Sequence, residues 1–138
     1  MEVLCRSVNL RMVNERSKLE TDCRVAYFET SYDAVFGVVY RPAFEARLRA
    51  QFEQGSAYED EDASWYALRN TVYASGCRSV LAKDSSISFV EAQALAWSYF
   101  ENALSVHTDI LFNPTGLSAV QALTLMVGHL VDSIHYNS

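Results

Sequence analysis

Apolar residues recur every three or four positions in five segments of the chain, which is the spacing of one face of an α-helix. The five apolar faces consist of Val25, Phe28, Tyr32, Val35 and Phe36; Phe44, Leu48 and Phe52; Trp65, Leu68 and Val72; Phe89, Ala92, Ala96, Tyr99, Phe100 and Ala103; and Val120, Leu123, Val127, Leu130 and Val131. No segment alternates apolar and polar residues with the period of two that a half-buried strand requires. The pattern therefore predicts an all-α fold of about five helices packed as an irregular array.

Local signals place the ends of these helices. Pro42 suits the first turn of the second helix, and Gly55 is expected to end it. Ser88 followed three residues later by Glu91 is the pattern of a capping box, so the fourth helix is expected to begin there. The fifth helix is expected to begin somewhere within residues 113–118.

Two helices have features that predict how they pack. The third, over about residues 63–80, carries the small residues Ser75, Gly76 and Ser79 on one side, which would let another helix approach closely. The fifth is apolar on nearly all its sides, and no charged residue occurs from Ile110 to Val131. We expect it to be a buried central helix of a soluble domain rather than a membrane span.

Composition and charge narrow the class of protein. The 138 residues fit one domain, and a 50% apolar content is enough to form a core. Seventeen acidic residues against eleven basic ones give a net charge of -6, which disfavours direct binding of nucleic acid or an anionic membrane. Only three cysteines occur, without a C-x-x-C pair, and this favours a reducing compartment over a secreted disulfide framework.

Residues that could carry chemistry are few. His129 and His135 lie six positions apart, which is not a metal-ligand spacing on a helix, and we interpret both as part of a fraying helix end. His107 is interpreted as lying near the edge of the helical core. Cys77, beside Arg78, is interpreted as a small packing residue rather than a nucleophile. The acidic run over residues 59–62 is expected to be a solvated loop. We therefore predict no catalytic, cofactor-binding or metal-binding residue, and no enzyme.

Three segments, taken in order, resemble a known family. The residues concerned are Tyr40, Arg41, Pro42, Ala43 and Phe44, where the family has H-R-P-x-F; then Trp65, Leu68, Asn70, Ala74, Ser75 and Gly76; then Trp97, Tyr99, Phe100, Ala103, Leu117, Val120, Gln121, Ala122, Leu123 and Met126. Over about residues 26–127 the chain resembles the fungal-specific transcription factor domain, the middle homology region of fungal zinc-cluster regulators. Residues 1–20 are then a variable N-terminal tail and residues 21–138 a partial copy of that domain.

The resemblance implies a regulatory or interaction module of a nuclear transcription factor that controls RNA polymerase II transcription. The family binds DNA through a separate module of six cysteines and two zinc ions. Cys5 and Cys23 have no further ligand near them, so we expect no zinc or other cofactor in this chain and only indirect contact with DNA. The likeness fades after Val127. A core cut short there should expose an apolar surface and bind a protein partner as a homodimer or heterodimer.

The residues expected to matter are structural, and other functions stay open. The structural set is Phe44, Trp65, Leu68, Trp97, Phe100, Val120 and Leu123. The alternative is a stand-alone helical protein that binds an apolar small molecule, in a pocket lined by Trp65, Trp97, Tyr99 and Phe100, or a partner helix. An enzyme of unassigned class and a chain that does not fold cooperatively alone are the remaining alternatives. Target genes, effector and the direction of regulation are not determined by the sequence.

Overall fold

The computed structural model describes residues 18–30, 37–54, 62–81, 83, 88–112 and 116–136. Within these residues the chain is helical and contains no strand, which confirms the all-α class. The helices are an unlabelled one over residues 18–30, then α2 (Arg41–Gln54), α3 (Ala63–Leu81), α4 (Phe89–Leu104), α5 (His107–Phe112) and α6 (Gly116–Tyr136). The six-residue α5 is the helix that the apolar pattern did not predict, since it is too short to show a period.

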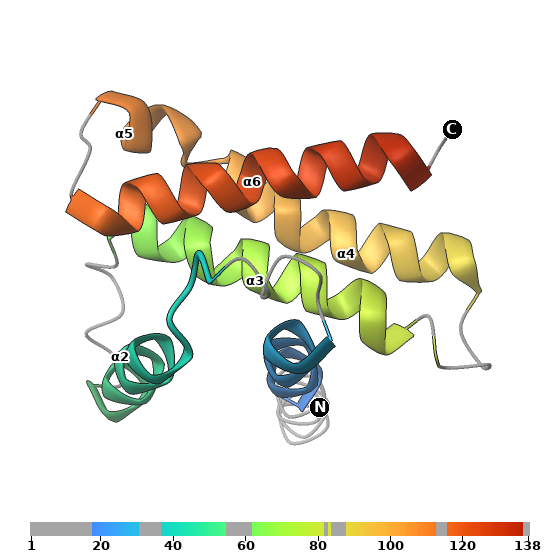
Figure 1. Ribbon diagram of the computed structural model, residues 1–138, viewed down its shortest axis with the longest axis horizontal. Helices are drawn as coiled ribbons and strands as arrows, with labels where there is room; N and C mark the ends of the chain where they lie inside the picture. The colour runs from blue at the N-terminus through green and yellow to red at the C-terminus, as the bar shows by residue number, and fades with distance from the viewer. Residues whose placement is uncertain are drawn as a thin grey trace, which may run out of the picture.

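Helix α3 is the centre of the array. It contacts α4, α5 and α6, and Figure 1 shows the axes of α3, α4 and α6 roughly aligned, with α4 running antiparallel to the other two. The 18–30 helix and α2 are seen nearly end-on on the other side of α3 (Figure 1). Thirteen of the 19 residues of α3 are buried, including polar ones. Those polar side chains find partners within the fold: Thr71 donates to the carbonyl of Ala67, and Asn102 donates to Asn70.

The prediction that the last helix is central was wrong. One face of α6 packs inward through Ala119, Ala122, Leu125, Met126 and His129. Its opposite face is apolar and open, with Leu117 71% exposed and Ile134 68% exposed. Because α6 is apolar on nearly all its sides, its sequence does not show which face is buried. The neighbouring helices that pack against it decide this. By length and composition alone, Gly116–Ile134 is also long and apolar enough to cross a membrane, as core helices of soluble proteins can be.

Three predicted helix boundaries agree with the structure. At the start of α4, the backbone N–H of Glu91 donates to Ser88 Oγ (3.2 Å) and that of Ser88 donates to the Glu91 carboxylate (3.3 Å). These two bonds form the capping box. Helix α2 ends at Gln54, directly before Gly55, and α6 begins at Gly116, inside the predicted interval.

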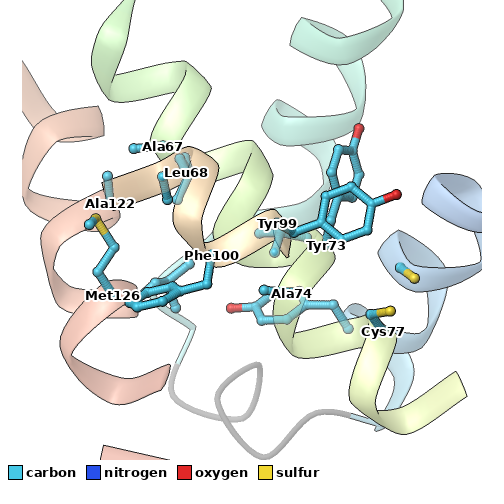
Figure 2. Close-up of a cluster of buried hydrophobic side chains, with 14 of the residues drawn as sticks. Ala67, Leu68, Tyr73, Ala74, Cys77, Tyr99, Phe100, Ala122 and Met126 are labelled. Atoms are coloured by element: carbon cyan, nitrogen blue, oxygen red, sulfur yellow. The ribbon is translucent and has the colours of Figure 1, made fainter. Parts of the chain in front are cut away.

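The small side of α3 does accept another helix, as predicted. A Cβ added to Gly76 would lie 1.7 Å from the backbone oxygen of Cys23, on the 18–30 helix. Cys23 and Cys77 are both fully buried at this crossing. Figure 2 shows Cys77 at one end of the core and Phe100 beside Met126 at the other. Glycine is therefore required at position 76 to bring the two backbones together.

The expected structural residues divide into two groups. Phe44, Trp65, Leu68 and Phe100 are buried, and Leu123 packs partly buried against the core. Two others lie at the surface, since Trp97 is 42% exposed and Val120 is 62% exposed. Phe52 and Phe89, which were assigned to apolar helix faces, are also exposed. Residues 1–17, with Cys5, and residues 59–61 of the acidic run lie outside the described residues.

Candidate functional site

A buried polar network links α3 to α6 around His129. This histidine is 1% exposed, so the interpretation of His129 as part of a fraying end was wrong. Its Nε2 lies 3.2 Å from Nη2 of Arg78, and its Nδ1 lies 3.4 Å from Ser75 Oγ. Arg78 Nη2 also donates to Ser133 Oγ, and Ser133 in turn donates to the carbonyl of His129. The network joins two pairs of residues that lie about 50 positions apart in the sequence.

The network fixes the protonation of His129. A guanidinium can only donate hydrogen bonds, so Nε2 accepts from Arg78 and the proton resides on Nδ1, facing Ser75. Burial, with the charge of Arg78 as a second cause, lowers the pKa of His129 to about 3. The ring also packs against Phe100, with centroids 4.6 Å apart. At neutral pH the imidazole is therefore uncharged, and Arg78 is the cation of the network.

A cleft of about 350 Å³ opens beside this network, between α3, α4 and α6. It is lined by Arg78, Val90, Gln93, Ala94, Ala96, Trp97, His129 and Ser133. These eight residues include one guanidinium and no carboxylate. The described part of the lining therefore combines one guanidinium, from Arg78, with one aromatic and several aliphatic side chains.

A second cavity, of about 310 Å³, lies where α2, α3 and α6 meet. It is lined by residues of the YRPAF segment, Tyr40, Ala43 and Phe44, together with Val39, Arg47, Trp65, Leu68, Leu117, Ser118 and Gln121. Arg47 is held over the Trp65 ring at 4.6 Å, donates to Ser118 and lies 3.6 Å from an oxygen of Asp62. The Trp65 indole donates to Gln51 (2.8 Å). The polar groups around this cavity pair with one another, so it is mainly a packing junction.

The structure does not bring together the aromatic pocket proposed as an alternative. Trp65 lines the α2 cavity, and Trp97 lines the cleft beside Arg78. Tyr99 and Phe100 are buried in the core, where Tyr99 packs edge-on against Tyr73 (5.7 Å), as Figure 2 shows. Trp65 and Trp97 therefore line two different cavities, while Tyr99 and Phe100 belong to the core.

Cysteine and metal chemistry find little support within the described residues. The thiols of Cys23 and Cys77 are buried neighbours, and the hydrogen bond between them, together with burial, raises the pKa of Cys23. Arg78 is directed to His129 and Ser133. In this part of the chain, no three His, Cys, Asp or Glu side chains gather where they could hold a metal ion. Two buried thiols do not provide the ligand set of a zinc cluster.

The outward face of α6 carries a row of exposed side chains. It presents Leu117, Val120, Thr124, Val127, Val131 and Ile134, which are alternately three and four residues apart and are all exposed. We call this row of side chains the outer stripe. Five of its six members are apolar, and the three–four spacing is that of a helix face that packs along a second helix. The sequence signal for the stripe was present, but the inward face of α6 shows the same spacing.

The chain is related in sequence to a fungal transcription factor. It is 36% identical over 99 residues to the fusaridione A cluster transcription factor fsdR of Fusarium heterosporum. The match covers 72% of this chain and 18% of the relative, so the chain spans less than a fifth of that protein. No family model matches the chain. No solved structure matches it either.

Proposed function

We propose that this chain is a regulatory and interaction module of a fungal transcription factor that acts in the nucleus on RNA polymerase II transcription. The observation that carries the proposal is the similarity to the fungal cluster transcription factor over 72% of the chain. The net charge of -6 is compatible with a module that does not touch DNA itself. DNA contacts are assigned to a zinc cluster outside the residues described here.

The outer stripe supplies the physical means of interaction. Burial of apolar surface contributes roughly 25 cal/mol per Å² of favourable free energy. An exposed row of apolar side chains therefore favours association with a partner that covers it. A second helix that packs along this row would cross α6 at about 20° and bury each apolar member in turn. We propose that the partner is another copy of the chain or the corresponding helix of a related regulator.

A reporter assay tests the transcriptional role. The chain is fused to a heterologous DNA-binding domain in a fungal host, and transcription from a reporter with the matching binding site is measured. The fusion should change transcription relative to the DNA-binding domain alone, in either direction. An unchanged reporter, with the fusion shown to be present in the nucleus, would contradict the proposed function.

Pairing through the outer stripe is tested separately. Two differently tagged copies are co-purified, and the mass of the purified chain is measured by sedimentation. Val120→Glu combined with Val127→Glu should abolish pairing, because each change places a charge in the middle of the stripe. Ala50→Glu, an equally acidic change at an exposed position of α2, should leave pairing intact. A wild-type chain that is monomeric and does not co-purify with a related regulator would contradict this part of the proposal.

A further inference from the structure

We infer that Cys23 and Cys77 are a site of reversible oxidation, at which hydrogen peroxide joins them in a disulfide that fixes the 18–30 helix to α3. The inference goes beyond the proposed function and does not depend on it, since a thiol pair could be oxidised in a protein with any role. It rests on three features of this helix crossing: the close approach of the two backbones, the burial of both thiols, and the hydrogen bond between them.

The close approach of the backbones brings the two cysteines near each other. A Cβ added to Gly76 would lie 1.7 Å from the carbonyl oxygen of Cys23 and 3.1 Å from its Cα. Cys77 directly follows Gly76, and consecutive Cα atoms are about 3.8 Å apart. Two Cα atoms joined through a disulfide usually lie about 4.4–6.8 Å apart. The crossing therefore places the Cα atoms of Cys23 and Cys77 close to this range.

The two thiols meet in the core. Both cysteines are fully buried, and the thiol of Cys23 donates a hydrogen bond to the sulfur of Cys77. Figure 2 shows the Cys77 side chain directed toward the 18–30 helix. Because the sulfur atoms are already in hydrogen-bond contact, small rotations of the two side chains bring them to bonding distance. Neither thiol has to reach a distant substrate, since each is the reaction partner of the other.

The hydrogen bond gives the two cysteines different roles. It lowers the pKa of Cys77, because the proton donated by Cys23 stabilises the Cys77 thiolate. It also raises the pKa of Cys23, which would have to give up the shared proton, and burial raises that pKa further. The thiolate is the form that attacks an oxidant. Cys77 is therefore the residue that reacts first with peroxide, and Cys23 is the residue that completes the disulfide.

The reaction balances with hydrogen peroxide as the oxidant. The Cys77 thiolate attacks one peroxide oxygen, the O–O bond breaks, and one water leaves while Cys77 becomes a sulfenic acid. The Cys23 sulfur then attacks the Cys77 sulfur, the S–O bond breaks, and a second water leaves as the S–S bond forms. Two electrons pass from the thiols to the peroxide, and the two thiol protons end in the two waters. A reducing dithiol reverses the change.

Burial and sequence separation set the consequences of oxidation. Peroxide is small and uncharged, so a local opening of the crossing is enough to admit it to the buried thiols. In the reducing compartment that the cysteine content favours, the pair is reduced at rest. The two cysteines lie more than 50 positions apart in the sequence, and a disulfide between them restricts the unfolded chain. Oxidation therefore stabilises the packing of the 18–30 helix on α3.

Peptide mapping of the full chain tests the inference. The reduced chain is treated with hydrogen peroxide while folded, the remaining thiols are alkylated in denaturant, and the protein is cut with trypsin. Trypsin cuts after Lys and Arg, so residues 19–24 should be released joined to residues 70–78, and a reducing dithiol should separate them. A folded, peroxide-treated chain that yields no such linked pair, or that links either cysteine to Cys5 instead, would overturn the inference.

A variant without Cys5 measures the effect on the fold. Cys5→Ser leaves Cys23 and Cys77 as the cysteines of the chain. Its oxidised form should unfold at a urea concentration at least about 1 M higher than its reduced form, because the disulfide restricts the unfolded state. Cys5→Ser combined with Cys77→Ser is the control, and peroxide should not shift its midpoint upward. If the control does not fold, the two forms of Cys5→Ser decide, and equal midpoints would overturn the inference.

Discussion

Gly76 lies against the backbone of Cys23, so that a Cβ at position 76 would be 1.7 Å from the Cys23 carbonyl oxygen. A backbone atom cannot move aside as the end of a flexible side chain can. The contact therefore sets the distance between α3 and the 18–30 helix. It also places two buried cysteines at the crossing, where any larger residue would separate the helices.

Gly76→Ala is expected to destabilise the fold by about 3 kcal/mol, although alanine gains about 1 kcal/mol in helix propensity. The measurement is chemical denaturation. Gly37→Ala is the comparison, because Gly37 has a positive φ of 65° with nothing near its missing side chain. There the expected cost is only about 1–2 kcal/mol, from backbone strain alone. Equal stability of Gly76→Ala and the wild type would show that the two helices are not in contact.

The buried histidine predicts a dependence of stability on pH. His129 has its pKa lowered to about 3 by burial and by Arg78, whereas in the unfolded chain it should be near 6.5. Below pH 6.5 the unfolded state binds a proton that the folded state does not. The contribution of His129 to stability is therefore complete above pH 6.5 and is lost as pH falls toward 3, by at most about 1.4 kcal/mol per pH unit.

This pH dependence is measured by denaturation between pH 7 and pH 4. His129→Phe should remove the part of the slope that His129 causes. His107→Gln removes an exposed histidine and should retain that part of the slope. An identical pH profile in wild type and His129→Phe would contradict the buried, neutral state of His129.

Two phenylalanines of α2 test where this helix packs. Phe44 is 3% exposed and contacts the rings of Phe28 (5.5 Å) and Trp65 (4.9 Å), whereas Phe52 is 58% exposed. Phe44→Ala should destabilise the fold by about 3–5 kcal/mol, because it leaves a cavity between α2 and α3. Phe52→Ala should change stability by no more than about 0.5 kcal/mol. Similar effects of the two substitutions would contradict the packing of α2.

The capping box of α4 gives a smaller, local prediction. Ser88→Ala removes the side-chain oxygen that accepts from the backbone of Glu91, and should cost about 1 kcal/mol. Ser98→Ala, at an exposed position in the same helix, is the control and should be nearly neutral. Thermal unfolding of both variants is the measurement. A Ser98→Ala variant that is as destabilised as Ser88→Ala would show that the loss is not due to the cap.

Some features of the candidate site could not be predicted from the sequence, because they join distant segments. Ser75 and Arg78 lie one turn apart on α3, and His129 and Ser133 lie one turn apart on α6. Each pair is an ordinary polar interruption of an apolar helix. Only the packing of α6 on α3 makes them one network, and only the position of α4 completes the cleft with Trp97. The spacing of histidines and cysteines along the sequence can indicate a metal site or a nucleophile. It does not indicate this arrangement of polar residues.

The sequence by itself determined the all-α class, the start of α4 at its capping box, the end of α2 before Gly55 and the need for a small residue at position 76. These features depend on local backbone chemistry and on apolar periodicity, both of which are determined by residues close together in the sequence. Tertiary structure alone decided that α3 rather than α6 is central, that His129 is buried and that the outer stripe remains in water. Both faces of α6 are apolar at helical spacing, so the choice of which face is buried depends on the complementary surface that α3 offers.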